Sequence, residues 1–150
     1  MNRPTLESEV CTALIRVGTR MAAGFDQRFA EFSLTQAQFR TLVGVIMLDR
    51  GEGITPSELA DHLFVERATL SVVAQALVKR GLLVRRPGAN RRSHRLSLTE
   101  AGIAMLQQSI APALQLADET VQGLSQAALQ NMLASLNHLE AHLRQAQKKA

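Results

Sequence analysis

The sequence of 150 residues has no Trp and no Tyr, and its only aromatic side chains are five Phe. Proteins that bind single-stranded nucleic acids without sequence preference stack successive bases on exposed aromatic rings, so this class of protein is not expected. A single cysteine, Cys11, excludes both an intramolecular disulfide and a cysteine-rich zinc module. Because free thiols persist in reducing compartments, we expect the protein in the cytoplasm.

Long apolar runs are absent as well. The longest uncharged stretch, residues 120–139, is interrupted at almost every turn by Gln, Asn, Ser or His, so it is a poor candidate for a transmembrane segment. The N-terminal segment has no apolar run of the kind found in a signal peptide. The composition, 46% hydrophobic and 20% charged, is typical of a globular protein that can form a hydrophobic core.

Signatures of enzymes are missing too. The Ser, Thr and Asp residues form no nucleophile elbow, no phosphate-binding loop and no catalytic triad order, so we expect neither catalysis nor a cofactor. His138 and His142 are four residues apart and share one face of a predicted helix. Two imidazoles do not complete a metal site, so we interpret them as part of a solvated helix flank and expect no bound metal.

The net charge of +4 is concentrated in one segment. Residues 79–95 contain seven basic residues and no acidic ones, whereas the remaining 133 residues have a net charge of −3. A basic patch on an otherwise mildly acidic chain favours a polyanionic partner more strongly than a uniformly basic surface would.

Apolar periodicity predicts helices in the N-terminal third of the chain. From Thr5 to about Phe32, apolar residues recur every three or four positions, which is typical of one face of a long helix. The stretch Thr35–Gln38 has the pattern of a capping box and predicts the start of a second helix. The residues predicted to form the buried face of this second helix are Phe39, Leu42, Val43 and Ile46.

Two more helices are predicted in the C-terminal third. The first begins after Thr99, is kinked rather than ended by Pro112, and stops at Gly123. The second begins after Ser125. Their apolar positions are Ile103, Leu106 and Ile110 in the first, and Leu129, Met132, Leu133, Leu136, Leu139 and Leu143 in the second. The terminal helices carry more apolar surface than a small central unit can cover, so we expect a C2 homodimer.

The middle of the chain has the pattern of two short helices joined by a tight turn. Thr55–Glu58 combines an N-cap Thr, a Pro at the first helical position and a Glu at the third, which predicts a helix over 57–63. An amphipathic helix is predicted over 67–80, with Gly81 at its C-terminal cap. The residues predicted to be buried are Leu59, Ala60 and Leu63 in the first helix, and Leu70, Val73, Ala74, Leu77 and Val78 in the second. This is a helix-turn-helix signature.

A basic hairpin is predicted directly after these helices, with strands over 82–86 and 95–98. A helix-turn-helix followed by such a hairpin is a winged helix. The predicted fold class is therefore mainly α, with a two-stranded β-hairpin as the wing. The predicted organisation is a winged helix-turn-helix DNA-binding region over 35–102 and a helical dimerisation region over 1–34 and 103–150.

This arrangement predicts binding to duplex DNA, because an α-helix fits the major groove and Arg is attracted into a narrow minor groove. The predicted contacts are Arg67, Thr69, Ser71 and Gln75 on the second helix of the motif, and Arg91, Arg92 and Arg95 on the wing. Ala68, Val72, Ala76 and Lys79 also avoid the predicted buried face. A solvated basic face is the alternative, but it does not explain why the charge lies on a turn beside a helix-turn-helix.

Several stretches of the chain resemble the MarR family of bacterial regulators. They are Leu59–Leu63, Arg67–Ser71, Leu77–Leu83 and the wing segment Asn90–Gly102. The resemblance implies an obligate homodimer joined through its first and last helices, palindromic duplex DNA as the partner, and in most cases repression. It also implies that Arg92 is the wing-tip arginine and that Arg67, Thr69 and Ser71 lie on the recognition helix. A small organic anion or a phenolic compound would be the effector.

Three positions depart from the pattern of that family. Asn90 stands where an acidic residue often holds the wing arginine. Glu66 stands where a small hydroxyl residue often caps the recognition helix, and Val72 stands where a basic residue is common.

Two alternative functions remain open. In one branch of the family a cysteine in the first helix senses organic hydroperoxides, and Val10–Leu14 around Cys11 is loosely similar. That branch activates the thiolate with nearby tyrosines, which this chain lacks, so a small residue packed at a helix interface is the favoured interpretation of Cys11. The alternative of a different class is a winged helix used as a protein-interaction module.

Overall fold

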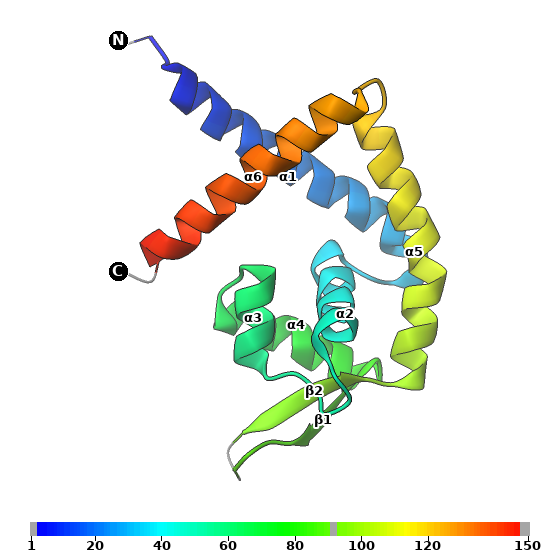
Figure 1. Cartoon of the computed structure of the whole chain (residues 1–150). Coiled ribbons are helices and arrows are strands. Elements are labelled where there is room, and N and C mark those ends of the chain that lie inside the picture. Colours follow the sequence, from blue (N-terminus) through cyan, green and yellow to red (C-terminus); the bar gives the residue numbers. More distant parts are fainter. Residues whose placement is uncertain (1–2, 91–92, 148–150) are drawn as a thin grey trace. The chain divides into compact units, whose positions relative to one another are not determined.

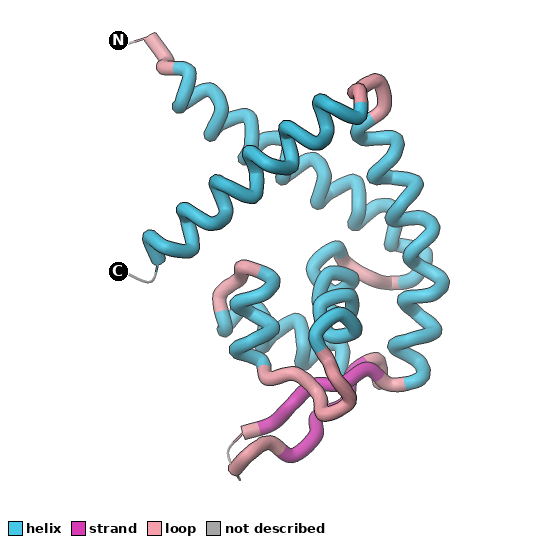
Figure 2. The backbone as a smooth tube through the Cα atoms, in the orientation of Figure 1, coloured by secondary structure: helices cyan, strands magenta, loops and turns pink. Residues whose placement is uncertain are grey.

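The computed structural model describes residues 3–90 and 93–147. The chain forms two compact units, Met1–Leu116 (unit 1) and Ala117–Ala150 (unit 2). The elements of the chain are its α-helices and strands, which Figure 1 labels, and a short 3-10 helix. They are α1 (Leu6–Phe29), the short 3-10 helix η1 (Ala30–Phe32), α2 (Gln36–Leu48), α3 (Pro56–Leu63), α4 (Arg67–Lys79), β1 (Leu83–Pro87), β2 (His94–Leu98), α5 (Glu100–Val121) and α6 (Gln126–Gln147). This order confirms the predicted mainly helical fold with one β-hairpin, and Figure 2 shows that the named strands are confined to this hairpin.

Local side-chain caps fix where the predicted helices begin. The Thr35 hydroxyl accepts a hydrogen bond from the Gln38 N–H, and the Gln38 side chain accepts one from the Thr35 N–H. Thr55 and Glu58 form the same reciprocal capping box at the start of α3, where Pro56 occupies the first helical position. The hydrogen bonds from the Thr55 hydroxyl and N–H lower the pKa of the Glu58 carboxyl. These two boxes confirm the starts predicted from sequence.

The core of unit 1 lies where α2, α3 and α4 pack together beside the hairpin (Figure 1). Its most completely buried side chains are Phe29, Leu42, Val45, Leu59, Leu70, Leu77, Leu83 and Leu96. The rings of Phe25 and Phe29 on α1 and Phe39 on α2 form a cluster. The ring centroids of Phe25 and Phe29 are 5.6 Å apart, and those of Phe29 and Phe39 are 4.5 Å apart. Three of the five phenylalanines therefore join the end of α1 to the core.

The prediction that Ile46 is buried was wrong. Ile46 is 51% exposed, and Val45 is buried in its place. The reason is the close approach of α3 to α2 at Gly44, where an added Cβ would lie 2.8 Å from Leu59 Cδ1. Because a glycine faces α3, the buried side of α2 is rotated away from the side that its largest apolar residues indicate.

Small residues also define the buried side of α5. The buried positions are Gly102, Leu106, Ser109 and Ala113, whereas Ile103 and Ile110 are 40% and 44% exposed. An added Cβ at Gly102 would collide with the carbonyl oxygen of Leu82, so only glycine permits this contact. Pro112 does not end α5, which continues to Val121, as predicted.

The last two predicted boundaries are also observed. Gly123 has φ +89°, the left-handed conformation that favours glycine, directly after α5. The Ser125 hydroxyl then accepts a hydrogen bond from the Ala128 N–H at 3.2 Å and caps α6. Along α6, the apolar side chains of Met132, Leu133, Leu136, Leu139 and Leu143 are 39–59% exposed.

Bilayer crossing requires a helix of sufficient length and apolar content. We find none that meets this requirement within residues 3–90 and 93–147.

Candidate nucleic-acid interface

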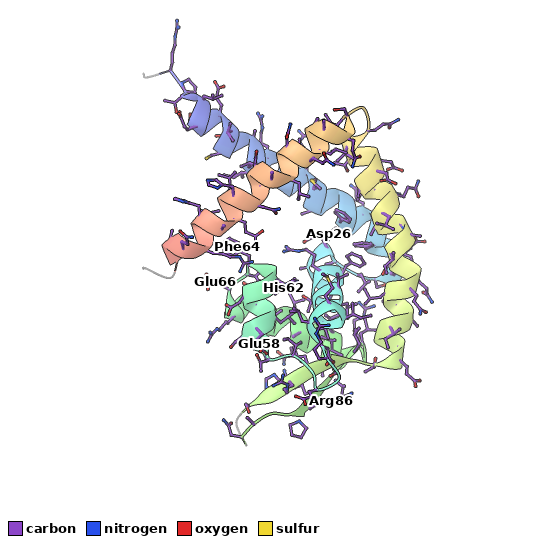
Figure 3. All side chains as sticks on the ribbon, in the orientation of Figure 1. Asp26, Glu58, His62, Phe64, Glu66 and Arg86 are labelled. Atoms are coloured by element: carbon purple, nitrogen blue, oxygen red, sulfur yellow. The ribbon has the colours of Figure 1, made fainter. Side chains whose placement is uncertain are left out.

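The turn between α3 and α4 gives the helix-turn-helix its geometry. Phe64 ends α3 in the left-handed conformation, with φ +55°, and the next N–H, of Val65, donates to the Ala60 carbonyl at 3.1 Å. Figure 3 labels Phe64 and Glu66 in this turn. The Arg40 guanidinium of α2 donates to the Leu63 carbonyl at 2.8 Å and so fixes the end of α3.

The far end of α4 is closed by backbone hydrogen bonds around a glycine. Gly81 has φ +72°; its N–H donates to the Val78 carbonyl at 2.9 Å, and the Leu82 N–H donates to the Leu77 carbonyl at 3.0 Å. This is the Schellman arrangement, and it confirms the cap predicted at Gly81. It also turns the chain directly into β1.

One side of α4 is buried and the other is open to solvent. Leu70, Ala74 and Leu77 are buried against the core. All four residues predicted to face the groove are exposed, namely Arg67, Thr69, Ser71 and Gln75. Glu66, at the N-cap position, makes no side-chain cap hydrogen bond, in keeping with its departure from the hydroxyl residue common there.

The hairpin pairs β1 and β2 in antiparallel register, from Leu83 opposite Leu98 to Pro87 opposite His94. Beyond the strands, the Asn90 side-chain oxygen accepts a hydrogen bond from the Ser93 N–H at 2.9 Å. Arg91 and Arg92, the predicted wing-tip contacts, lie outside the residues that the structure describes. The hydrogen bond between Asn90 and Ser93 therefore joins the described residues on the two sides of the turn.

A carboxylate at the end of α2 anchors the base of this hairpin. Asp49 Oδ1 accepts hydrogen bonds from the N–H groups of Gly51 at 2.8 Å and Gly53 at 2.7 Å, and Oδ2 accepts one from the Ser97 hydroxyl at 2.9 Å. Partial burial opposes ionisation, but these three hydrogen bonds and the charge of Arg86 outweigh it, so the pKa of Asp49 lies below its usual value. The sequence analysis missed Asp49, although an Asp two and four residues before glycines is a signal for such a turn.

Three arginines of the basic segment bind backbone carbonyls. Arg80 Nη1 donates to the Ser33 carbonyl at 2.6 Å and Nη2 donates to the Phe32 carbonyl at 3.1 Å. Arg95 Nε donates to the Gly53 carbonyl at 2.9 Å, and Arg86, labelled in Figure 3, donates to the Gly51 carbonyl at 3.4 Å. The basic segment thus fixes the hairpin to its neighbours as well as carrying positive charge. Arg95, predicted as a wing contact, is only partly exposed.

The remaining candidates from the sequence lie outside the helix-turn-helix. Cys11 is a free, exposed cysteine on α1. His138 and His142 are exposed on α6, as expected for a solvated flank. Over the described ranges, no three His, Cys, Asp or Glu side chains come together in a way that could hold a metal ion.

A helix-turn-helix with an exposed second helix, followed at once by a basic antiparallel hairpin, defines a winged-helix DNA-binding transcription regulator. A family model described as "MarR family" matches residues 32–93, which span α2, α3, α4 and the start of the wing. Over these residues the chain is similar to the MarR family of regulators.

Known regulators match along most of their length. The chain is 26% identical over 145 residues to the HTH-type transcriptional regulator PecS of Dickeya dadantii (strain 3937), covering 94% of this chain and 87% of PecS. A MarR-family transcriptional regulator from Silicibacter pomeroyi is 28% identical, with a TM-score of 0.73 and 92% of each chain covered. BpsR of Bordetella bronchiseptica, whose DNA binding is regulated by 6-hydroxynicotinic acid, is 25% identical, with a TM-score of 0.80 and coverage of 93% of this chain and 99% of BpsR. PecS and the Silicibacter protein are both named as transcriptional regulators.

Proposed function

We propose that this regulator is a homodimeric repressor that binds palindromic duplex DNA and is released from it by a small organic effector. The observation that carries this proposal is the open side of α4, which lies next to a basic hairpin in the same compact unit. A helix of this kind enters the major groove, and a hairpin beside it reaches the phosphates and the adjacent minor groove.

The proposed division of labour follows the two kinds of surface on the chain. Residues 35–102 would bind DNA, and residues 1–34 and 103–150 would form the dimer. Support for the second role comes from exposed apolar side chains on α1, which are Leu6, Val10, Leu14, Ile15, Val17 and Met21, and from those on α6. A two-fold axis between two chains would present two recognition helices to the two halves of a palindrome.

The proposed DNA contacts are divided between the two grooves. Arg67, Thr69, Ser71 and Gln75 would face base edges and phosphates in the major groove. Arg91 and Arg92 would enter the minor groove, where the potential is most negative, and Arg95 would add charge at the base of the wing. The exposure of the four α4 residues supports the first group.

The proposed effector is a small organic anion or a phenolic compound. A hollow on unit 1 between α1 and α5, lined by Gly24, Gln27, Arg28, Glu31 and Leu116, is our candidate for its binding site. Arg28 is the basic residue of this lining, and guanidinium groups bind carboxylates. The regulation of BpsR by 6-hydroxynicotinic acid, an aromatic acid, supports this class of compound. Binding would shift the dimer population toward a spacing of the two recognition helices that does not fit the operator.

The salt dependence of duplex binding tests the proposal. A dimer that neutralises about six phosphates should lose affinity with a slope near −5 in a plot of log K against log salt concentration. The measurement uses the full-length chain and a duplex obtained by selection from a random pool. A shallow slope, or selection that yields no palindrome, would instead support a winged helix used as a protein-interaction module.

A further inference from the structure

An apolar stripe runs along the centre of the open side of α4. Val72 is 70% exposed, and Ala68, four residues earlier, is exposed as well. Val72 lies two residues from Leu70 and from Ala74 in the buried row, and Ala68 lies two residues from Leu70. Residues two positions apart on a helix are about 200° apart around its axis, so they lie on nearly opposite sides. Val72 therefore projects directly away from the core.

The fold itself gives no reason for a valine at this position. A β-branched residue is a weaker helix former than the charged or straight-chain residues that usually occupy exposed helix positions. Val72 buries little of its side chain within the chain, so it adds little to the core. Single exposed apolar residues need no explanation in general, but this one occupies the middle of the face proposed to enter the groove.

The neighbours of Val72 on this face fit a nucleic-acid partner. Gln75 and Lys79 follow three and seven residues later on the same side of the helix, and both are exposed. The face is thus apolar at its centre, polar beside that centre and basic at its C-terminal end. This distribution suits a surface that reads base edges at its centre and holds a phosphate at its end.

We propose that Val72 packs against the 5-methyl group of a thymine and makes the operator preference depend on that methyl. Among the four bases only thymine presents a methyl group in the major groove, and apolar side chains contact it there. Gln75 lies about 4.5 Å further along the helix axis, somewhat more than the rise of about 3.4 Å per base pair, and its amide can bind the N6 and N7 atoms of an adenine. The pair therefore specifies an A·T-containing step in each half-site. This inference rests on the proposed entry of α4 into the major groove.

The test removes only the methyl group from the DNA. The full-length chain first selects a duplex from a random pool, and each thymine of that duplex is then replaced in turn by deoxyuridine. At one thymine in each half-site, we expect loss of the methyl to weaken wild-type binding about fourfold, as for burial of one methyl-sized group. Fluorescence anisotropy at fixed salt measures the affinities.

The matching change removes the methyl groups from the protein. We expect Val72→Ala to weaken binding to the thymine duplex by a similar factor and to be indifferent to deoxyuridine at the same position, because the two losses remove one contact. Ile46→Ala, which truncates a half-exposed apolar side chain on α2, is the control and should keep the full deoxyuridine sensitivity. Circular dichroism compares the helical content of each variant with that of the wild-type chain.

The outcomes separate this inference from the proposed function. A Val72→Ala variant that retains the wild-type deoxyuridine profile, or a wild-type chain that is sensitive at no thymine, overturns the methyl contact while duplex binding stands. A wild-type chain that selects and binds no duplex overturns both proposals. Loss of sensitivity at one thymine per half-site in Val72→Ala alone supports the contact.

Discussion

The guanidinium of Arg80 donates a hydrogen bond to the carbonyl oxygen of Ser33 at 2.6 Å, across 47 residues of sequence. Arg80 is the residue that follows α4, and Ser33 is the left-handed residue that ends η1 after α1. A second bond, to the Phe32 carbonyl, makes the contact two-pronged. The end of the candidate recognition helix is therefore bonded to the end of η1, the short helix that follows α1.

Replacing Arg80 by Met should lower the free energy of unfolding by about 1 kcal/mol, because two charge-assisted hydrogen bonds are lost at an exposed site. Arg80→Lys should lose nearly as much stability, since an ammonium cannot span both carbonyls, while it keeps the charge. Urea denaturation measures the change. Arg85→Met is the control on the exposed surface of β1, and equal losses in Arg80→Met and Arg85→Met would show that the carbonyl contacts contribute nothing.

Replacing Asp49 by Asn should destabilise the hairpin base by about 1 kcal/mol at neutral pH, because the carboxylate accepts three hydrogen bonds. The pKa of Asp49 lies below the usual value of 3.8, so ionised Asp49 stabilises the fold fully above pH 3.8. This stabilisation is lost as the pH falls through the folded-state pKa. Unfolding by urea at a series of pH values should show the difference between wild type and Asp49→Asn narrowing toward acid pH. A difference that stays constant would argue against the carboxylate, and Asp118→Asn, an exposed acidic residue, serves as control.

Gly53→Ala should destabilise the protein more than Gly51→Ala. Both glycines have positive φ, +103° at Gly51 and +82° at Gly53, so both variants lose about 1 kcal/mol to backbone strain. Only at Gly53 would the added Cβ also crowd Arg95 Cβ and Ser97 Oγ, each at 3.0 Å, whereas nothing lies within 4 Å at Gly51. Thermal unfolding of the two variants compares the losses directly. Equal losses would mean that the hairpin yields to the extra methyl without cost.

Arg92→Ala should weaken binding to a selected duplex about tenfold or more, while the dimer survives. The reason is the loss of a guanidinium from the proposed minor-groove contact. Anisotropy with labelled duplex gives the affinity, and analytical ultracentrifugation gives the oligomeric state. Arg3→Ala changes a basic residue far from the wing in sequence and should leave the affinity unchanged. Wild-type affinity in Arg92→Ala would refute the wing assignment.

Cys11→Ser should leave the response of DNA binding to an organic hydroperoxide unchanged. Cys11 is exposed, but the chain contains no tyrosine to activate a thiolate in the manner of the hydroperoxide-sensing branch. Electrophoretic mobility shifts with and without cumene hydroperoxide compare the two proteins. If the oxidant releases wild type from DNA and not Cys11→Ser, the chain is a redox sensor acting through this thiol.

The order of the elements and most of their ends could be predicted because their causes are local. The capping boxes at Thr35 and Thr55 and the glycines at 81 and 123 act within a few residues of chain. The open side of α4 could also be predicted, since its buried row follows the helical period. The wing contacts Arg91 and Arg92 and the groove contacts on α4 remain predictions.

The buried side of a helix and the partners of charged side chains were decided by tertiary structure. The close approach at Gly44 exposed Ile46, and the contact of Gly102 with Leu82 set the buried side of α5, because the nearest neighbour and not the largest side chain determines burial. Arg80 and Arg95 bind carbonyls 47 and 42 residues away, and no local pattern specifies such partners. The sequence by itself thus determined a winged helix with a concentrated positive charge. The tertiary structure decided which of those charges hold the hairpin in place, because the carbonyls that they bind lie far away in the sequence.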